Sequence, residues 1–197
     1  MQTTSPLPIT TTPRIHVTDR LFWEICQQNP ELRLERTAQG ELIVNPPTGG
    51  ETGGSNADLI IDIGIWSRKA NLGKIFDSST GFRLPNGATR SPDVSWVLWD
   101  RWNDLQPEQR RSFIPLAPDF ALELMSPSDK LSDVQDKMQE YIDNGVRLGW
   151  LINLDGKTVE IYRLGQPVQV VNIPCTLRGE DVLIGLQLQM SKSEQQH

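Results

Sequence analysis

Glu123 interrupts a run of apolar residues, FALELM, that extends from Phe120 to Met125. A nearly continuous apolar run of this length is typical of a strand that is covered on both faces. An unpaired carboxylate in such surroundings is costly to ionise unless a cation, a proton or hydrogen-bond donors lie close by. Glu123 is therefore a candidate functional residue.

A helix is predicted directly after this strand, over residues 127–144. Ser126, Pro127 and Asp129 are typical of a helix start with a short capping box, and Gly145 is typical of a helix end. The apolar residues of the helix repeat at helical spacing and point one stripe at the sheet: Leu131, Val134, Met138, Tyr141 and Ile142.

Lys137 flanks this apolar stripe, so its ammonium group can lean back toward the end of the strand that carries Glu123. Asp133, one turn earlier, is its expected ion-pair partner. Taken alone, such a pair is most often a solvated helix pair worth roughly 0.3–0.5 kcal/mol. Together with Glu123, Lys137 forms half of a candidate active site.

The composition bounds the class of protein. A chain of 197 residues with 37% hydrophobic content predicts one globular domain, over residues 13–190. Residues 1–12 are rich in Thr and Pro and carry no charge, which predicts a disordered tail without the features of a signal peptide. Residues 191–197 are expected to be a polar tail.

Neither a membrane span nor a zinc site is expected. No apolar run approaches the length of a membrane span, and Cys26 and Cys175 form no CxxC or zinc spacing. These features predict a soluble protein of a reducing compartment, hence a cytoplasmic one.

The formal net charge of −6 has the wrong sign for a protein that holds nucleic acid by bulk electrostatics. It does not exclude a nuclease, which clusters carboxylates at its centre and can carry a local basic rim. Such a rim has these candidates, each of which can equally be an ordinary solvated charge: Arg68, Lys69, Lys74, Arg83 and Arg90.

The first half of the chain predicts a helix, a hairpin and a second helix. Thr18 is a plausible N-cap for a helix through Gln28, and residues 32–36 and 41–45 alternate as a hairpin does. The Gly-rich stretch PPTGGETGGSN lacks the GK[ST] of a phosphate-binding loop, so it is given no nucleotide role. After it, Ser55 and Asp58 predict the start of a helix.

A second carboxylate, that of Asp93, is expected at the start of a later strand. Residues 73–76 and 80–84 are strand candidates, and Asn86-Gly87 is a strong turn signal. The following strand begins at Pro92, with Asp93, Ser95 and Val97 on one face and Val94 and Trp96 on the other. An Asp after Pro is usually a turn residue when it stands alone.

The remaining elements complete an α/β (α+β) fold with a central mixed β-sheet flanked by helices. Residues 100–112 are polar, as in a surface loop or short helix. Strands are predicted at 148–154, 158–163 and 168–173, with a weak one at 181–184.

Several motifs carry a resemblance that covers nearly the whole chain, from Thr18 to about Leu188. RSPDVSWV, PDFALELMSPSDK, the spacing D-x-x-x-K-x-x-x-Y-x-x-x-G from Asp133 to Gly145, and GWLINLDGKTVEIYR resemble the Uma-two family of endonucleases, which is abundant in cyanobacteria. That family belongs to the PD-(D/E)XK nuclease superfamily. The resemblance implies a restriction-endonuclease-like fold, a DNA substrate and Mg²⁺ or Mn²⁺ as cofactor. It also allows a homodimer, because nucleases of this superfamily commonly cut duplexes as dimers.

The resemblance also implies roles for single residues. By position, Asp93 matches the first metal-binding acid, Glu123 matches the second, and the backbone carbonyl of Leu124 would be a further metal ligand. Met125 stands where the superfamily motif places its lysine, and Lys137 matches the lysine of this family. Glu51 stands where members often carry a His, and a carboxylate there can serve as an outer metal ligand.

This donor set has a coherent chemistry of its own. Two carboxylates and a carbonyl are hard oxygen ligands that suit Mg²⁺ or Mn²⁺, with water completing the octahedron. Lys137 would orient the nucleophile or stabilise developing negative charge. Two functions remain open: a metal-dependent DNA endonuclease, and a nuclease-fold protein without cleavage that binds nucleic acid or a protein partner.

Overall fold

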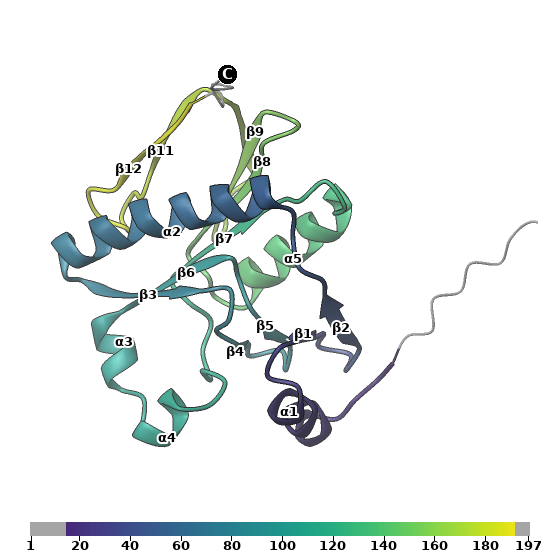
Figure 1. Cartoon of the computed structure of the whole chain (residues 1–197). Helices are drawn as coiled ribbons and strands as arrows, with labels where there is room; N and C mark the ends of the chain where they lie inside the picture. The colour runs from purple at the N-terminus through teal and green to yellow at the C-terminus, as the bar shows by residue number, and fades with distance from the viewer. Residues whose placement is uncertain (1–14, 192–197) are drawn as a thin grey trace, which may run out of the picture.

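Six strands form the central sheet, which crosses the middle of the molecule in Figure 1. The computed structural model describes residues 15–191. In spatial order the strands are β10 (Gln169–Asn172), β9 (Thr158–Arg163), β8 (Leu148–Asn153), β7 (Phe120–Leu124), β6 (Val94–Leu98) and β3 (Gly73–Asp77). β7 and β8 are parallel and the other neighbouring pairs are antiparallel, so the sheet is mixed, as predicted.

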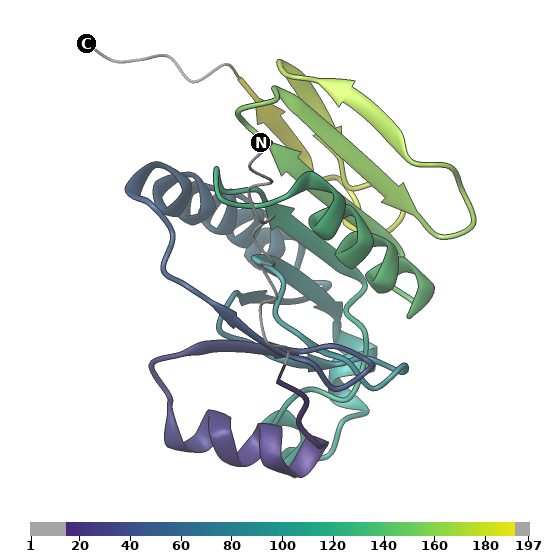
Figure 2. The same cartoon turned by 90° about the vertical axis from the view of Figure 1, so that its right-hand side faces the viewer.

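Helices cover both faces of this sheet. α2 (Gly50–Ala70) lies along one face and α5 (Leu131–Asp143) along the other, as Figures 1 and 2 show together. All five residues of β7 are buried, because a strand with both faces covered has no solvent side. Gly149 of β8 lets α5 come close, since a Cβ at this position would lie 2.5 Å from the Met138 side chain.

The side chains of β6 alternate between the two faces as the sequence predicts. Val94 and Trp96 pack in the core on the α2 side, whereas Val97 packs in the core on the α5 side. On β7, Leu122 belongs to the α2 side and Ala121 to the α5 side. The positions of Asp93 and Glu123 therefore share the face that α5 covers.

A smaller sheet lies beside the central one. Its strands, in spatial order, are β2 (Leu42–Asn45), β1 (Arg33–Arg36), β5 (Thr89–Arg90) and β4 (Phe82–Arg83). It contains the predicted hairpin, β1–β2, and a second hairpin, β4–β5, at the predicted turn. The second hairpin turns at Asn86-Gly87, where Gly87 has a φ of 89°, a conformation that favours glycine.

Short elements complete the described chain. α1 (Asp19–Gln28) begins as predicted, because the Thr18 side chain accepts a hydrogen bond from the Leu21 N–H. The polar stretch 100–112 contains the short helices α3 (Trp99–Asn103) and α4 (Pro107–Arg110). β11 (Cys175–Arg178) and β12 (Gln187–Met190) form a two-stranded sheet.

The strand predicted at 181–184 is wrong. Val182 and Leu183 are buried, as an apolar strand would be, but their N–H groups donate to the carbonyl of Gly179 and form a turn. Apolar residues in a short stretch predict burial, and burial alone does not select strand over turn.

The two helix starts predicted from capping boxes are wrong, although the start of α1 at Thr18 is confirmed. α2 begins at Gly50 instead of Ser55, and the Gly53 N–H already donates to the Gly49 carbonyl. α5 begins at Leu131 instead of Pro127, because the Asp129 side chain accepts from the Ser126 N–H and closes a separate turn. A capping motif contributes about 1 kcal/mol, so the packing of the flanking chain can move the helix start.

The predicted tail 1–12, and residues 192–197 of the predicted C-terminal tail, lie outside the described residues. Between Ile15 and Ser191, no helix is both long enough and apolar enough to cross a membrane.

Candidate active site

A groove of about 800 Å³ opens where β6 begins and β7 ends. Its walls come from the small sheet, the first turns of α2 and the N-terminal half of α5. Asp93, Glu123, Leu124 and Lys137 all line it. The structure thus brings four of the five candidate residues into one groove, which is called the central groove below.

Two neighbouring strands position the carboxylates of Asp93 and Glu123. β6 and β7 are antiparallel, so the start of one lies beside the end of the other. The Leu124 N–H donates to Asp93 Oδ2 at 2.8 Å. Because the N–H and C=O of a strand residue point to the same side, the Leu124 carbonyl also faces the side on which Asp93 lies.

The Glu123 carboxylate is held by two donors on α5. Its Oε1 lies 2.9 Å from the Lys137 ammonium and accepts a hydrogen bond of 2.8 Å from the Tyr141 hydroxyl. Burial, together with the charges of Asp93 and Glu35, raises the pKa of Glu123 to about 8 despite Lys137. Burial and the charge of Glu123 also raise the pKa of Tyr141, so its hydroxyl stays a donor.

Asp93 is less well supplied with donors. Burial, followed by the charge of Glu35, raises the pKa of Asp93, and the Leu124 N–H and Lys137 offset this only in part. Oδ1 of Asp93 and Oε2 of Glu123 have no hydrogen-bond or ion-pair partner among residues 15–191. Each carboxylate therefore keeps one oxygen available for a ligand.

Lys137 lies between two carboxylates, 2.9 Å from Glu123 Oε1 and 2.9 Å from Glu35 Oε1. The expected pair with Asp133 is wrong, because the buried carboxylates compete for the ammonium more strongly than an exposed one does. Burial lowers the pKa of Lys137, but the charges of Glu123 and Glu35 outweigh it and raise the pKa above its ordinary value. Lys137 is therefore a fixed positive charge.

Glu35 of β1 is the member of this cluster that sequence reasoning missed. Its side chain is only 3% exposed, although it occupies a polar position in a strand that alternates. It accepts from the Ser91 N–H at 2.9 Å and pairs with Arg90 at 3.2 Å. Burial would raise the pKa of Glu35, but Lys137 and Arg90 lower it, so the carboxylate is ionised. No local signal identifies it, because its partners come from distant segments.

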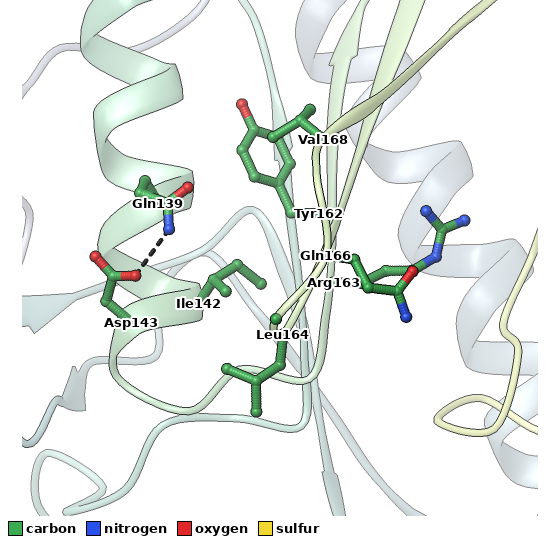
Figure 3. Close-up of a pocket in the computed structure, with 9 residues that line it drawn as sticks. Gln139, Ile142, Asp143, Tyr162, Arg163, Leu164, Gln166 and Val168 are labelled. Atoms are coloured by element: carbon green, nitrogen blue, oxygen red, sulfur yellow. Dashed lines mark hydrogen bonds between the residues drawn. The ribbon is translucent and has the colours of Figure 1, made fainter.

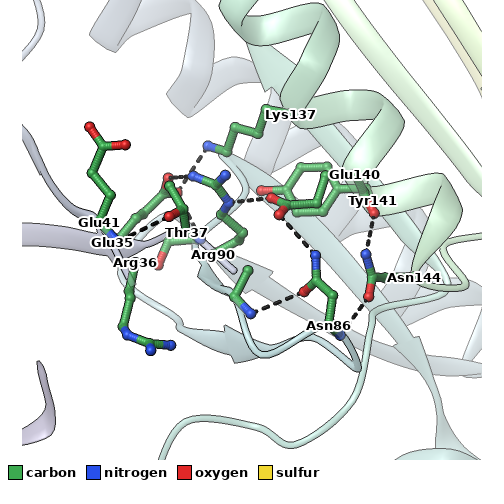
Figure 4. A network of polar contacts seen from close by, with 12 residues as sticks. Glu35, Arg36, Thr37, Glu41, Asn86, Arg90, Lys137, Glu140, Tyr141 and Asn144 are labelled. Atoms are coloured by element: carbon green, nitrogen blue, oxygen red, sulfur yellow. Dashed lines mark hydrogen bonds and ion pairs between the residues drawn. The ribbon is translucent and has the colours of Figure 1, made fainter. Parts of the chain in front are cut away.

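Arg90 links this cluster to the C-terminal half of α5, as Figure 4 shows. Its Nε donates to Glu140 Oε2 at 2.6 Å, and Glu140 in turn accepts from the Asn86 side chain. Asn86 also donates its backbone N–H to the Asn144 side chain. The small sheet is thus fastened to α5 at Lys137 and, on its C-terminal side, at Glu140 and Asn144.

Replacing Arg90 with Met is expected to lower the free energy of unfolding by about 3–5 kcal/mol. Arg90 is 8% exposed, and its loss leaves two carboxylates in a buried cluster with one cation fewer. Urea unfolding followed by circular dichroism measures the change. Arg147→Met is the matched control, because its pair with the exposed Asp181 should contribute less than about 1 kcal/mol. Equal losses in the two variants would contradict the assigned role of Arg90.

Glu51, the fifth candidate, does not join the cluster. It lies in the first turn of α2 with its side chain exposed, and the groove is lined by Thr48 and Thr52 on either side of it in sequence. Because α2 already includes Glu51 and Thr52, their side chains point in different directions. Thr52 lines the groove, whereas Glu51 points to solvent. The buried carboxylate near the two acids is Glu35 instead.

The candidate basic rim does not form either. Of its five residues only Arg90 lines the groove, and it is committed to Glu35 and Glu140. Lys74 lies over the Trp102 ring, 4.4 Å from its centroid, and Arg83 is 3.7 Å from Asp19. The basic residues that line the groove besides Arg90 and Lys137 are Arg33 and Lys130.

The charges of the cluster fit a divalent cation. Four carboxylates, of Glu35, Asp93, Glu123 and Glu140, lie around two cations, Lys137 and Arg90. The cluster therefore has more acids than its own bases neutralise, and the charges of Asp93 and Glu35 add to the effect of burial in raising the pKa of Glu123. In residues 15–191, no three His, Cys, Asp or Glu side chains could hold a metal by themselves. A cation here would take Asp93, Glu123, the Leu124 carbonyl and water.

A second, smaller pocket of about 390 Å³ lies between α5 and the turn from β9 to β10 (Figure 3). It is lined by Gln139, Asp143, Tyr162 and Leu164 among others, and Gln139 donates to Asp143 within it. It has neither a buried acid pair nor a lysine between acids. The chemistry of the molecule is therefore assigned to the central groove.

Comparisons with known proteins agree with this fold. A family model, Uma2 (Uma-two above), described as "Putative restriction endonuclease", matches residues 20–191. No curated protein sequence matches the chain.

A crystal structure of a protein described as "a putative nuclease belonging to DUF820", from Anabaena variabilis, has the same fold. Its TM-score is 0.67 at 22% sequence identity, and the match covers 79% of this chain and 86% of the other.

Proposed function

The chain belongs to the Uma2 family, and on this premise we propose that it is a metal-dependent endonuclease that hydrolyses phosphodiester bonds of DNA. The observation that carries the proposal is the pair of acids, half-buried Asp93 and buried Glu123, beside the ammonium of Lys137 in one groove. Strongly perturbed carboxyl groups that converge in a groove are typical of a site that binds or transforms a ligand.

Mg²⁺ or Mn²⁺ is the cofactor that this donor set supports. Asp93 Oδ1, Glu123 Oε2 and the Leu124 carbonyl would hold it, since hard cations of this size take one or two carboxylates, neutral oxygens and water. A bound cation would supply charge for the phosphate and a lowered pKa for a bound water. Lys137 is not among its ligands, because an ammonium group has no lone pair.

The residues around the acids have defined tasks in this proposal. Lys137 keeps its proton, so it acts as a fixed charge that orients the attacking water or stabilises the charge on the phosphate, and not as a general base. Tyr141 and Lys137 fix one oxygen of Glu123, which leaves the other directed to the cation. Glu35 holds Lys137 in place from the opposite wall, and Arg90 in turn pairs with Glu35.

DNA is the proposed substrate, and the groove has features for contacts to its backbone. Arg33 and Lys130 provide positive charge, and the Ser78, Ser79 and Ser128 hydroxyls line the same groove. With a net charge of −6 the chain gains little from bulk attraction, so binding should depend strongly on the bound cation and on low salt.

Incubation of supercoiled plasmid with purified protein tests the proposal. Nicked and linear products should form with Mg²⁺ or Mn²⁺ and not with EDTA. If no DNA of any form is cut under these conditions while the protein still retards DNA in a gel, the chain is a binding protein with a nuclease fold.

Metal binding can also be measured without DNA cleavage, through the melting temperature of the protein. Asp93→Asn is expected to raise the melting temperature in EDTA by a few degrees, because it removes one charge from an acid-rich cluster and can still accept from the Leu124 N–H. Added Mn²⁺ should then stabilise the wild type by mass action and leave the variant nearly unchanged.

Differential scanning fluorimetry of both proteins, in EDTA and in Mn²⁺, measures these shifts. A variant that melts lower than wild type in EDTA, combined with no Mn²⁺ response in wild type, would show that Asp93 is a structural turn residue.

A further inference from the structure

The charged cluster of the central groove lies at the floor of the groove. Glu123 is only 7% exposed, and the Lys137 side chain is 17% exposed. The small sheet and α5 meet directly at this floor, because the Lys137 ammonium lies 2.9 Å from Glu35 on the opposite wall. A substrate must therefore enter between the two walls before it reaches these groups.

The size of the groove fits a single strand of nucleic acid better than a duplex. Its volume of about 800 Å³ is in the range of sites that enclose one organic ligand, roughly 300–1,000 Å³. A duplex holds two backbones together, with a major groove about 12 Å wide between them, so one backbone cannot enter a narrow groove without the other. A few nucleotides of a single strand can bend into this volume.

Apolar side chains line the groove beside the charged cluster. Leu32 lines it and is 45% exposed, and Ile43 lies on the same face of the small sheet as its cross-strand partner Glu35. Further apolar residues of the lining are Leu34, Pro46, Pro47, Phe113 and Val134. Sites for single strands cover the faces of unstacked bases with apolar and aromatic side chains, whereas a duplex keeps these faces stacked.

Two basic residues of the groove have charges that no ion pair occupies. Arg33 and Lys130 line the groove and form no ion pair with another of residues 15–191. Arg33 lies two residues from Glu35 on β1, so both are on the face that lines the groove. Burial raises the pKa of Asp93, and the charge of Arg33 is among those that lower it, which places Arg33 near the acids.

The groove also has acids that limit how many phosphates it can accept. Three exposed carboxylates line it, those of Glu31, Asp129 and Asp133. A duplex laid across the groove would bring phosphates of both backbones close to these carboxylates. A short single strand has few phosphates, and these can lie at Arg33 and Lys130 instead.

We propose that the central groove binds an unpaired DNA strand, with its bases against the apolar lining and its phosphates at Arg33, Lys130 and the proposed cation. Cleavage of this strand rests on the proposed nuclease function, whereas its binding does not. Continuous duplex would be cut only after its strands separate locally. Negatively supercoiled plasmid favours such opening, so it should be nicked faster than the same plasmid in relaxed form.

Fluorescence anisotropy of a short labelled oligonucleotide, alone and annealed to its complement, tests the proposal in Ca²⁺. The single strand should bind at least about tenfold more tightly than the duplex. Duplex binding that is equal or tighter, or no binding of either form, would overturn the proposal. Cleavage is then assayed separately in Mn²⁺. A strand that binds with the expected preference and is never cut would overturn the proposed nuclease function and leave the strand site in place.

Leu32→Ser tests the apolar lining. It should raise the dissociation constant of the single strand by about threefold or more, because the bases lose a contact surface. Leu21→Ser is the matched control, since Leu21 is 44% exposed on α1 and does not line the groove. Equal effects of the two substitutions would contradict the placement of the bases.

The salt dependence of binding tests the placement of the phosphates. Each phosphate contact of a single strand contributes about −0.7 to the slope of log K against log salt, so two contacts predict a slope of about −1.4. Arg33→Gln should reduce its magnitude by about half. Arg178→Gln should leave the slope unchanged, because Arg178 is an exposed arginine of β11 outside the groove. A slope that Arg33→Gln does not alter would refute the placement of a phosphate at Arg33.

Discussion

Replacing Asp93 with Asn or Glu123 with Gln is expected to reduce metal-dependent DNA cleavage by about a thousandfold or more. Each change keeps the size of the side chain and removes one charge from the proposed cation ligands. The charge stabilisation supplied through such ligands amounts to several kcal/mol, and about 1.4 kcal/mol corresponds to a tenfold change in rate. Single-turnover cleavage of a labelled duplex in Mg²⁺ measures the loss.

Glu160 provides a control that closely matches Glu123. It is also a buried glutamate on the central sheet, in register with Leu151, which is itself in register with Glu123. Its carboxylate accepts from Gln135 and Tyr162 and lies outside the groove. Glu160→Gln should therefore cut DNA as wild type does. Equal losses in the two glutamine variants would indicate a general effect of buried charge, and full activity in Glu123→Gln would remove the metal site from this groove.

Lys137→Ala is expected to lower the rate of cleavage by about 10²–10³, the usual cost of removing one group that stabilises transition-state charge. The concentration of Mn²⁺ for half-maximal activity should stay the same or fall, because the substitution removes a positive charge from beside the cation site. The rate of cleavage should thus fall while the apparent affinity for Mn²⁺ is kept or increased. This combination separates a group that acts on the substrate from a ligand of the metal.

Lys137→Arg should restore little of this rate. Lys137 places one compact ammonium 2.9 Å from both Glu35 and Glu123, and a planar guanidinium cannot occupy the same point with the same contacts. A variant with wild-type rate, or an alanine variant that needs far more Mn²⁺, would show that Lys137 supports the metal ligands instead of the reaction.

The sequence predicted the strands that carry Asp93 and Glu123 because their signals are local. Alternation in β6 and the apolar run of β7 reflect which faces are covered, and both were confirmed by the packing. The helix starts were wrong where a capping motif competed with packing. β3 joins the central sheet through β6, a pairing between segments that no turn signal connects.

The residues of the candidate site were predictable where they lie on or beside strongly patterned elements, and not elsewhere. Asp93, Glu123 and Lys137 lie on strongly patterned elements, so their faces follow from periodicity. Glu35 lies on a short strand where the pattern assigns it to solvent, and it is buried because Lys137 and Arg90 approach from other elements. The place of Glu51 along the chain predicts a metal ligand, but the rotation of α2 directs its side chain away from the groove.

The position of Glu35 affects how the site behaves over time. One wall of the groove belongs to a sheet whose strands are two to four residues long, so it has fewer backbone hydrogen bonds than the central sheet has. Such small units undergo local unfolding more often than the core does. Each opening of the β1–β2 hairpin separates Glu35 from Lys137 while β7 stays protected from hydrogen exchange. We therefore expect the fraction of molecules with an assembled site to depend on the opening equilibrium of this hairpin more than on the global stability of the protein.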